Sequence, residues 1–231
     1  MIKVENIDWW GFEHAVRGMR NPLNSWDKSD SYICDDKHCG SCKQNPETRD
    51  CNQSDGYHVG KNDLDLMRRL YKAGTEHRKY LRQIFVSMDI TAPLYWWKEF
   101  DTYKVGTVSN SCSTMHKIAA KEFTEDDFSH EKLMNETDVP FFSPRGTLGQ
   151  IINTLNYCRE KYLETKDKDW WWQMIQLLPS SYNQKRTITM NYENVISIIK
   201  QRTNHKLDEW NEFIKELKFL PYVNEIIEET E

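Results

Sequence analysis

The sequence predicts an α+β fold in which a mixed sheet is flanked by long helices. Apolar residues recur at helical spacing over 148–162 and 207–217, which is typical of helices with one buried face. Over 84–90, apolar residues occupy every second position instead, and this alternation predicts a strand. The chain therefore combines helices and strands along its length.

Glycine, proline and asparagine residues mark where the remaining predicted elements begin and end. A predicted helix over 63–74 ends at a glycine, which suits the position after a helix. Pro93 opens a second helix, because proline is tolerated in a first turn. The apolar segment 170–178 is predicted to be helical and ends before a proline, and a short strand is predicted over 186–190. Asn191 then serves as the N-cap of another helix.

The length of 231 residues suits a single domain, which we expect to span 1–231. Residues 25–61 are polar and hold four of the six cysteines, so we predict an inserted Cys-rich knuckle there. Residues 121–145 carry mixed charge and two prolines, which predicts a surface flap. Paired tryptophans at 96–97 and the three at 170–172 are expected to serve the core or a subunit interface.

Composition excludes several classes of protein. The net charge of −5 argues against a protein that coats nucleic acid, which requires a basic surface. No apolar run reaches the ~18 residues of a membrane span. The first residues lack the pattern of a secretion signal, so we expect a cytoplasmic protein whose cysteines are reduced or metal-bound.

Four cysteines of the polar segment form a candidate zinc site. Their spacing includes one close pair, which zinc sites often contain, although the other two spacings follow no standard pattern. Free thiols are the main alternative, followed by an iron–sulfur cluster. The predicted metal ligands are Cys34, Cys39, Cys42 and Cys51.

The order of these elements and a few local motifs resemble the flavin-dependent thymidylate synthases. The motifs are Ala92-Pro93, Leu178-Pro179 and Asn191 with Arg202, and the resemblance covers roughly 62–117 and 145–215. In that family an Arg-rich signature follows the Ala-Pro helix at the distance where this chain has the polar segment 102–115. The resemblance implies that this segment contacts a ligand; the alternative is a polar loop that joins two helices.

The resemblance also assigns the candidate ligand-binding residues. They share hydroxyl, amide or basic side chains that can satisfy a polar ligand. The alternative for the basic ones is a solvated surface. The set comprises His77, Arg78, Lys79, Arg82, Tyr103, Lys104, Thr107, Ser109, Asn110, Ser111, Thr114, Asn191 and Arg202.

The chain departs from the family at charged positions. Thr114 stands where the family has an Arg that grips phosphate, and Thr102-Tyr103-Lys104 replaces Arg-His-Arg. Arg82 occupies a Glu position, and Glu193 replaces an Arg used near flavin. We therefore predict a nucleotide-binding protein that does not perform the standard flavin chemistry.

Cys112 is the candidate catalytic residue, because it stands where the family has the Ser near the reacting pyrimidine. A thiolate can attack such a ring if it is stabilised, and His116 and Lys117 lie near in sequence. The alternative is that Cys112 is a packing residue.

Three functions remain open at the level of sequence. The first is binding or sequestering a nucleotide. The second is a divergent methyl- or hydroxymethyltransferase for pyrimidine nucleotides, which by resemblance would use FAD, NADPH and a folate. The third is a structural or interaction module. The family resemblance further implies a homotetramer.

Overall fold

The computed structural model describes residues 2–33, 56–136 and 143–227 of the chain. The chain divides into two compact units, and β4 (Phe85–Pro93) and β6 (Asn183–Asn191) run through both. That the whole chain 1–231 forms a single domain stays a prediction. The first unit comprises Met1–Lys3, Ile90–Thr102 and Asn110–Thr187; the second comprises Val4–Asp89, Tyr103–Ser109 and Ile188–Glu231.

One four-stranded sheet forms the framework, with strand order β1-β4-β6-β5. The inner strands are the two predicted ones, and on β4 every second residue is buried, as the alternation indicated. The outer strands are β1 (Lys3–Trp10) and β5 (Thr107–Ser111). Neither was predicted, because edge strands carry polar residues and lack a simple apolar alternation. β5 lies within the polar segment 102–115, so part of that segment is a strand.

The second unit holds helices that follow the predicted pattern closely. The predicted helix over 63–74 is α2, and the Asn191 cap is confirmed, since its Oδ1 accepts a hydrogen bond of 3.0 Å from the backbone N–H of Asn194. The predicted helix over 207–217 is α8, but it is followed by the short helix α9, which was not predicted. The helices are α1 (Phe12–Arg20), α2 (Lys61–Ala73), α7 (Tyr192–Arg202), α8 (Asp208–Lys218) and α9 (Val223–Ile227).

A buried ion pair lies close to the two described ends of the polar segment 25–61. The short strands β2 (Tyr32–Ile33) and β3 (Tyr57–His58) pair antiparallel there. Arg20 donates from Nε to Asp63 over 2.5 Å, and both side chains are buried. Burial alone would raise the pKa of Asp63, but hydrogen bonds from Ser31 and Ser29, together with Arg20, lower it below the usual value. The carboxylate is therefore charged at neutral pH.

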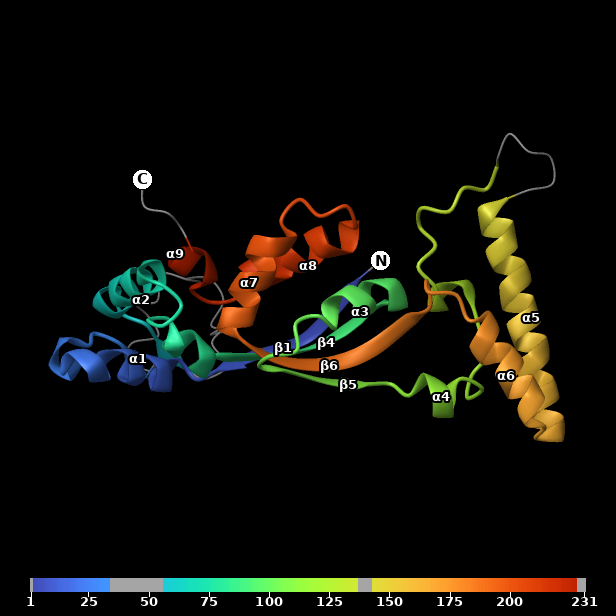
Figure 1. Cartoon of the computed structure of the whole chain (residues 1–231), viewed down its shortest axis with the longest axis horizontal. Helices are drawn as coiled ribbons and strands as arrows, with labels where there is room; N and C mark the ends of the chain where they lie inside the picture. Colours follow the sequence, from blue (N-terminus) through green and yellow to red (C-terminus); the bar gives the residue numbers. More distant parts are fainter. Residues whose placement is uncertain (1, 34–55, 137–142, 228–231) are drawn as a thin grey trace, which may run out of the picture. The chain divides into compact units, whose positions relative to one another are not determined.

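The first unit is mainly helical and contains α3 (Leu94–Phe100), α4 (Thr114–Lys117), α5 (Pro144–Thr165) and α6 (Lys168–Leu177). The helices α5 and α6 lie side by side (Figure 1). Trp96 and Trp97 on α3 are buried, which confirms the core prediction for this pair, whereas Trp172 on α6 is exposed.

The segment 121–145, predicted as a surface flap, contributes in part to the core of the first unit. Phe123 and Phe128 are both buried and pack in one cluster with Leu155, Cys158 and other residues of α5 and α6. Three acidic residues lie between the two phenylalanines, and their charge made the segment look like an exposed one in the sequence. Residues 137–142 of the predicted flap lie outside the described ranges.

Across the described ranges, we find no helix whose length and apolar character would let it cross a membrane.

Candidate functional site

The predicted ligand segment 102–115 is divided between the two units. Residues 103–109 belong to the second unit, and the residues from Asn110 onward belong to the first. The candidate residues therefore form two groups, one in each unit.

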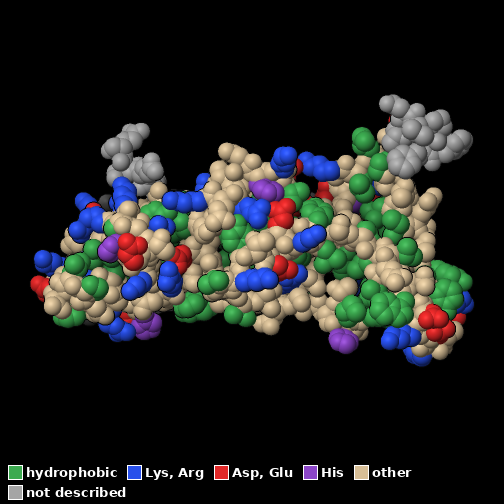
Figure 2. All heavy atoms as spheres, viewed as in Figure 1, with side chains coloured by type: hydrophobic (Ala, Val, Ile, Leu, Met, Phe, Trp, Pro, Cys, Tyr) green, Lys and Arg blue, Asp and Glu red, His purple; other side chains and the backbone are tan. Residues whose placement is uncertain are grey.

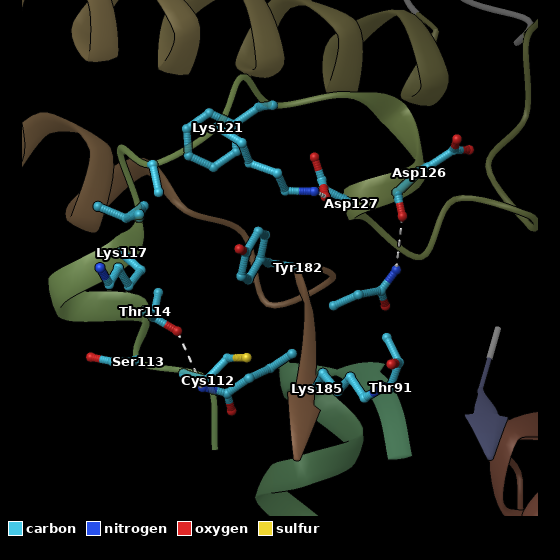
Figure 3. A pocket seen from close by; sticks show the side chains of 15 residues that line it. Thr91, Cys112, Ser113, Thr114, Lys117, Lys121, Asp126, Asp127, Tyr182 and Lys185 are labelled. Atoms are coloured by element: carbon cyan, nitrogen blue, oxygen red, sulfur yellow. Dashed lines mark hydrogen bonds and ion pairs between the residues drawn. The ribbon is translucent and has the colours of Figure 1, made fainter. Parts of the chain in front are cut away.

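A hollow of about 390 Å³ lies in the first unit, and we call it the Cys112 pocket (Figure 3). This volume lies within the range of small-molecule sites. The polar side chains of its wall come from α4 and the residues beside it, from the segment before α5, and from the residue before β6. They are Cys112, Thr114, Lys117, Lys121, Asp127 and Tyr182.

Gln184 fixes the chain around Cys112. Its side-chain Nε2 donates to the Cys112 carbonyl oxygen over 2.9 Å and to the Thr114 hydroxyl over 3.2 Å. The Cys112 N–H donates to the Lys185 carbonyl oxygen over 3.0 Å. The Cys112 side chain is exposed, and its sulfur lies on the pocket side of the chain (Figure 3). The thiol is therefore accessible on a segment with a fixed backbone.

Tyr182 and Lys121 supply hydrogen-bond donors to the same pocket. Burial, and secondarily the negative charge of Asp127, raise the pKa of the Tyr182 phenol, so it is protonated at neutral pH. Lys121 forms an ion pair with Asp127, and the hydrogen bond between them raises the pKa of the ammonium. Asp127 also accepts a hydrogen bond of 2.9 Å from the Thr124 backbone N–H, which fixes the carboxylate in place. Sequence reasoning missed Tyr182, Lys121 and Gln184, since no local motif marks them.

The expected neighbourhood of Cys112 and His116 is not formed. Lys117 lines the Cys112 pocket, but His116 lines a different hollow of the first unit. On the one-turn helix α4, these consecutive residues point in different directions. His116 therefore does not line the pocket that contains the thiol.

In the second unit, the two charge reversals identified in the sequence meet each other. Arg82 forms an ion pair with Glu193, and its second hydrogen bond, from Nη2 to Oε1, is 3.3 Å long. Each residue replaces one of opposite charge in the family pattern, and in this chain the two side chains attract each other. The expectation that Arg82 supplies free positive charge to a ligand is not supported, because Glu193 already neutralises it.

Arg78 and Lys200 lie against the same aromatic ring. The guanidinium carbon of Arg78 lies 4.9 Å from the centre of the Tyr71 ring, and the Lys200 ammonium lies 4.8 Å from it. These are cation–π distances. The Arg78 Nε is buried without a hydrogen-bond partner among the described residues. His77 and Lys79, the other basic candidates in this loop, are exposed.

The guanidinium group of Arg202 contacts two aromatic side chains, one through a hydrogen bond and one through its ring. Its Nε donates to the Tyr103 hydroxyl over 3.0 Å, and its guanidinium carbon lies 4.6 Å from the centre of the Trp210 ring. One Nη lies 3.2 Å from His205 Nε2. The structure thus brings the predicted ligand residues Tyr103 and Arg202 together, where they contact each other.

The turn before β5 is fixed by asparagines at the start of α7. Asn194 Nδ2 donates to the Val105 carbonyl oxygen over 2.7 Å and to the Thr107 hydroxyl over 2.9 Å. Gly106 has φ of +74°, and a Cβ there would lie 2.5 Å from Asn191 Nδ2. Glycine is therefore required at this close approach. The candidates Thr107 and Asn191 serve this junction.

The remaining candidates divide into exposed residues and residues outside the described ranges. Lys104, Ser109, Asn110 and Ser111 are exposed, and the last three lie on the edge strand β5. The zinc prediction concerns Cys34, Cys39, Cys42 and Cys51, which lie outside the described residues. Within the described residues, no cluster of His, Cys, Asp and Glu is suited to a metal ion.

Comparison with solved structures identifies the fold of this chain. No family model matches the sequence, and no curated protein matches it. The flavin-dependent thymidylate synthase ThyX from Helicobacter pylori, complexed with FAD and dUMP, is similar with a TM-score of 0.64 at 15% identity, over 98% of each chain. The UMP/dUMP methylase PolB from Streptomyces cacaoi, bound with 5-Br UMP, is similar with a TM-score of 0.60 at 12% identity, over 97% of this chain and 92% of that one. The protein is thus a divergent chain with the fold of the flavin-dependent thymidylate synthases.

Proposed function

We propose that the protein binds a pyrimidine nucleotide and that the Cys112 pocket contributes to the site. One observation carries the proposal: a hollow of about 390 Å³ is lined by an accessible thiol, a protonated phenol and the side chain of Lys117. The solved structures of similar fold include one complexed with dUMP and one bound with 5-Br UMP. Similar fold alone does not confer the same ligand, so the proposal rests on the pocket.

The side chains of the pocket match the chemistry of such a ligand. The Tyr182 hydroxyl can donate a hydrogen bond to a carbonyl oxygen of the base, because the phenol keeps its proton at neutral pH. Lys117 offers an ammonium group to phosphate, although as a point charge it lacks the paired geometry of arginine, whereas the Lys121 ammonium is already paired with Asp127. Cys112 is the group in this pocket able to attack a pyrimidine ring, as we predict from its position.

The residues of the second unit fit a flavin poorly. Arg82 is neutralised by Glu193, and the guanidinium groups of Arg78 and Arg202 lie against aromatic rings. Among the described residues, the arginines at the positions where the resemblance places flavin and phosphate are therefore already paired or stacked. This supports nucleotide binding without the standard flavin chemistry.

Calorimetric titration of the purified chain with UMP, dUMP and purine monophosphates tests the proposal. We expect saturable binding of at least one pyrimidine nucleotide. Replacing Lys117 with Gln should weaken it about tenfold, which corresponds to ~1.4 kcal/mol. Lys206→Gln, at an exposed position far from α4 in sequence, is the matched control and should leave the affinity unchanged. Absence of binding across the panel would refute the proposal.

The second candidate function is a flavin-dependent methyltransferase for pyrimidine nucleotides. It is favoured by the similar Helicobacter pylori enzyme, which is complexed with FAD as well as dUMP. When bound, flavin would supply redox chemistry that side chains cannot. The absorbance spectrum of the protein mixed with FAD and then desalted distinguishes the two functions. Retained yellow colour would favour the methyltransferase, whereas a colourless protein that still binds nucleotide would favour the first candidate.

A further inference from the structure

A second hollow of about 420 Å³ lies in the first unit, and we call it the Trp171 hollow. Its walls come from α4 and from the turn between α5 and α6. The helix α4 contributes Thr114 and Lys117 to the Cys112 pocket but Met115 and His116 to the Trp171 hollow. The side chains that carry the argument are His116, Tyr162, Lys166, Lys168 and Trp171.

The hollow is lined by basic side chains and by none that is acidic among the described residues. The Lys166 ammonium lies 5.9 Å from the centre of the Tyr162 ring, and the Lys168 ammonium lies 5.8 Å from that of Trp172. No ion pair of either lysine is found among the described residues. The nearby Asp167 instead accepts a hydrogen bond of 3.0 Å from the Asp169 N–H, at the start of α6. Because the lining itself carries basic and no acidic side chains, the hollow favours an anion.

Lys166 occupies an unfavourable backbone conformation at this position. Its φ is +59°, in the left-handed region, where the end of a helix normally places glycine or asparagine. A non-glycine residue is strained there, and strained backbone positions cluster at functional sites.

Two aromatic rings give the hollow flat, fixed walls. The Trp171 indole N–H donates to the Met115 carbonyl oxygen over 3.1 Å, which sets the orientation of the ring and ties α6 to α4. The Lys166 N–H donates to the Tyr162 carbonyl oxygen over 2.9 Å, which ties the turn to α5. Figure 2 shows apolar side chains beside Lys or Arg and Asp or Glu side chains over this end of the α5–α6 pair. A planar ring can stack on such walls.

We infer that the Trp171 hollow binds a small anion that carries a flat aromatic or heteroaromatic ring, with a phosphate or carboxylate held by Lys166, Lys168 and His116. The ring stacks against Trp171 or Tyr162. This site is separate from the proposed nucleotide site, and it is tested without reference to the Cys112 pocket.

Reductive labelling of the full chain with pyridoxal phosphate tests the inference, because this probe is a flat ring with a phosphate and an aldehyde. A lysine amine attacks the aldehyde carbon and water leaves. Borohydride then delivers hydride to the imine carbon while the nitrogen gains a proton, giving a stable secondary amine. Mass spectrometry of peptides locates the label. We expect Lys166 or Lys168 to be labelled at least about tenfold faster than Lys161, a difference of ~1.4 kcal/mol in activation free energy.

The controls separate specific binding from general lysine reactivity. Lys161 lies on the same helix α5 and is paired with Glu164 at 2.9 Å, so it serves as the internal reference. Pyridoxal, which lacks the phosphate, should lose the preference. The uncharged and charged pair benzaldehyde and para-formylbenzoate tests a carboxylate in the same way, and the faster anion identifies the preferred head group.

Variants keep the test decisive if one of them misfolds. His116→Gln changes an exposed side chain and should reduce the labelling preference severalfold, as should Trp171→Leu, while Cys112→Ser should leave it unchanged. Equal labelling of Lys161, Lys166 and Lys168, or equal rates with charged and uncharged aldehydes, would overturn the inference.

Discussion

At the scale of single residues, the buried charge of Asp63 is the clearest determinant of stability. Its oxygens accept hydrogen bonds from Arg20 at 2.5 Å and from the hydroxyls of Ser29 and Ser31 at 2.7 and 2.6 Å. Replacing one partner of such a pair leaves the other charge buried and unpaired. We expect Asp63→Asn to lower the free energy of unfolding by about 3–5 kcal/mol, measured by urea denaturation.

Asp65 on the same helix provides the control for Asp63. Its ion pair with Arg69 is exposed on both sides, so Asp65→Asn should change stability by less than about 1 kcal/mol. The pH dependence gives a second check. Because the folded pKa of Asp63 is lowered, its contribution is present above the unfolded value near 3.8 and is lost as the pH falls through the folded value. The difference between wild type and Asp63→Asn should therefore shrink below about pH 4; a constant difference would contradict this assignment.

The Arg82–Glu193 pair makes a second prediction at the same scale. Arg82→Glu and Glu193→Arg should each destabilise the fold by up to about 1 kcal/mol, because like charges then face each other across a half-exposed contact. The double variant exchanges the charges and should recover most of the loss. A double-mutant cycle by chemical denaturation measures the coupling. Additive losses in the double variant would show that the two side chains do not interact.

At the scale of elements, the turn into β5 depends on Gly106. A Cβ at this residue would lie 2.5 Å from Asn191 Nδ2, and the backbone φ of +74° is itself unfavourable for other residues. Gly106→Ala should therefore destabilise the protein by roughly 1–3 kcal/mol, observed as a lower midpoint of thermal unfolding.

A glycine elsewhere in the chain serves as the opposite control for Gly106. Gly149 lies within α5, and a Cβ there would meet nothing within 4 Å. Gly149→Ala should stabilise the protein by about 0.5–1 kcal/mol, because alanine is the better helix former. If both alanine variants shifted the midpoint in the same direction, the close approach at Gly106 would not be the cause.

At the scale of the whole molecule, the protein is proposed to form a homotetramer, as the family resemblance implies. Leu163 on α5 and Trp172 on α6 are large exposed apolar side chains, and such groups are suited to subunit contacts. Light scattering should give a mass about four times that of the chain. Leu163→Glu combined with Trp172→Glu should reduce this mass. Lys206→Glu, at an exposed polar residue, is the control and should leave the mass unchanged.

Local signals in the sequence predicted much of the fold. The alternation over 84–90, the apolar stripe over 148–162 and the Asn191 cap correspond to β4, α5 and the start of α7. These features depend on residues close together in the chain, so periodicity and capping chemistry reveal them. The edge strands β1 and β5 escaped prediction, because their polar residues carry no such period.

The sequence by itself determined the α+β architecture and the segment in which the family pattern is altered. Only the tertiary structure decided what the altered residues contact. Arg82 and Glu193 are 111 positions apart, and each one alone reads as the loss of a family charge, yet together they form an ion pair. Likewise, Tyr182 and Lys121 line the same pocket as Cys112. His116, which is close to Cys112 in sequence, lines a different hollow. Contacts between distant residues are set by how the elements pack, and a single sequence records the elements but not their packing.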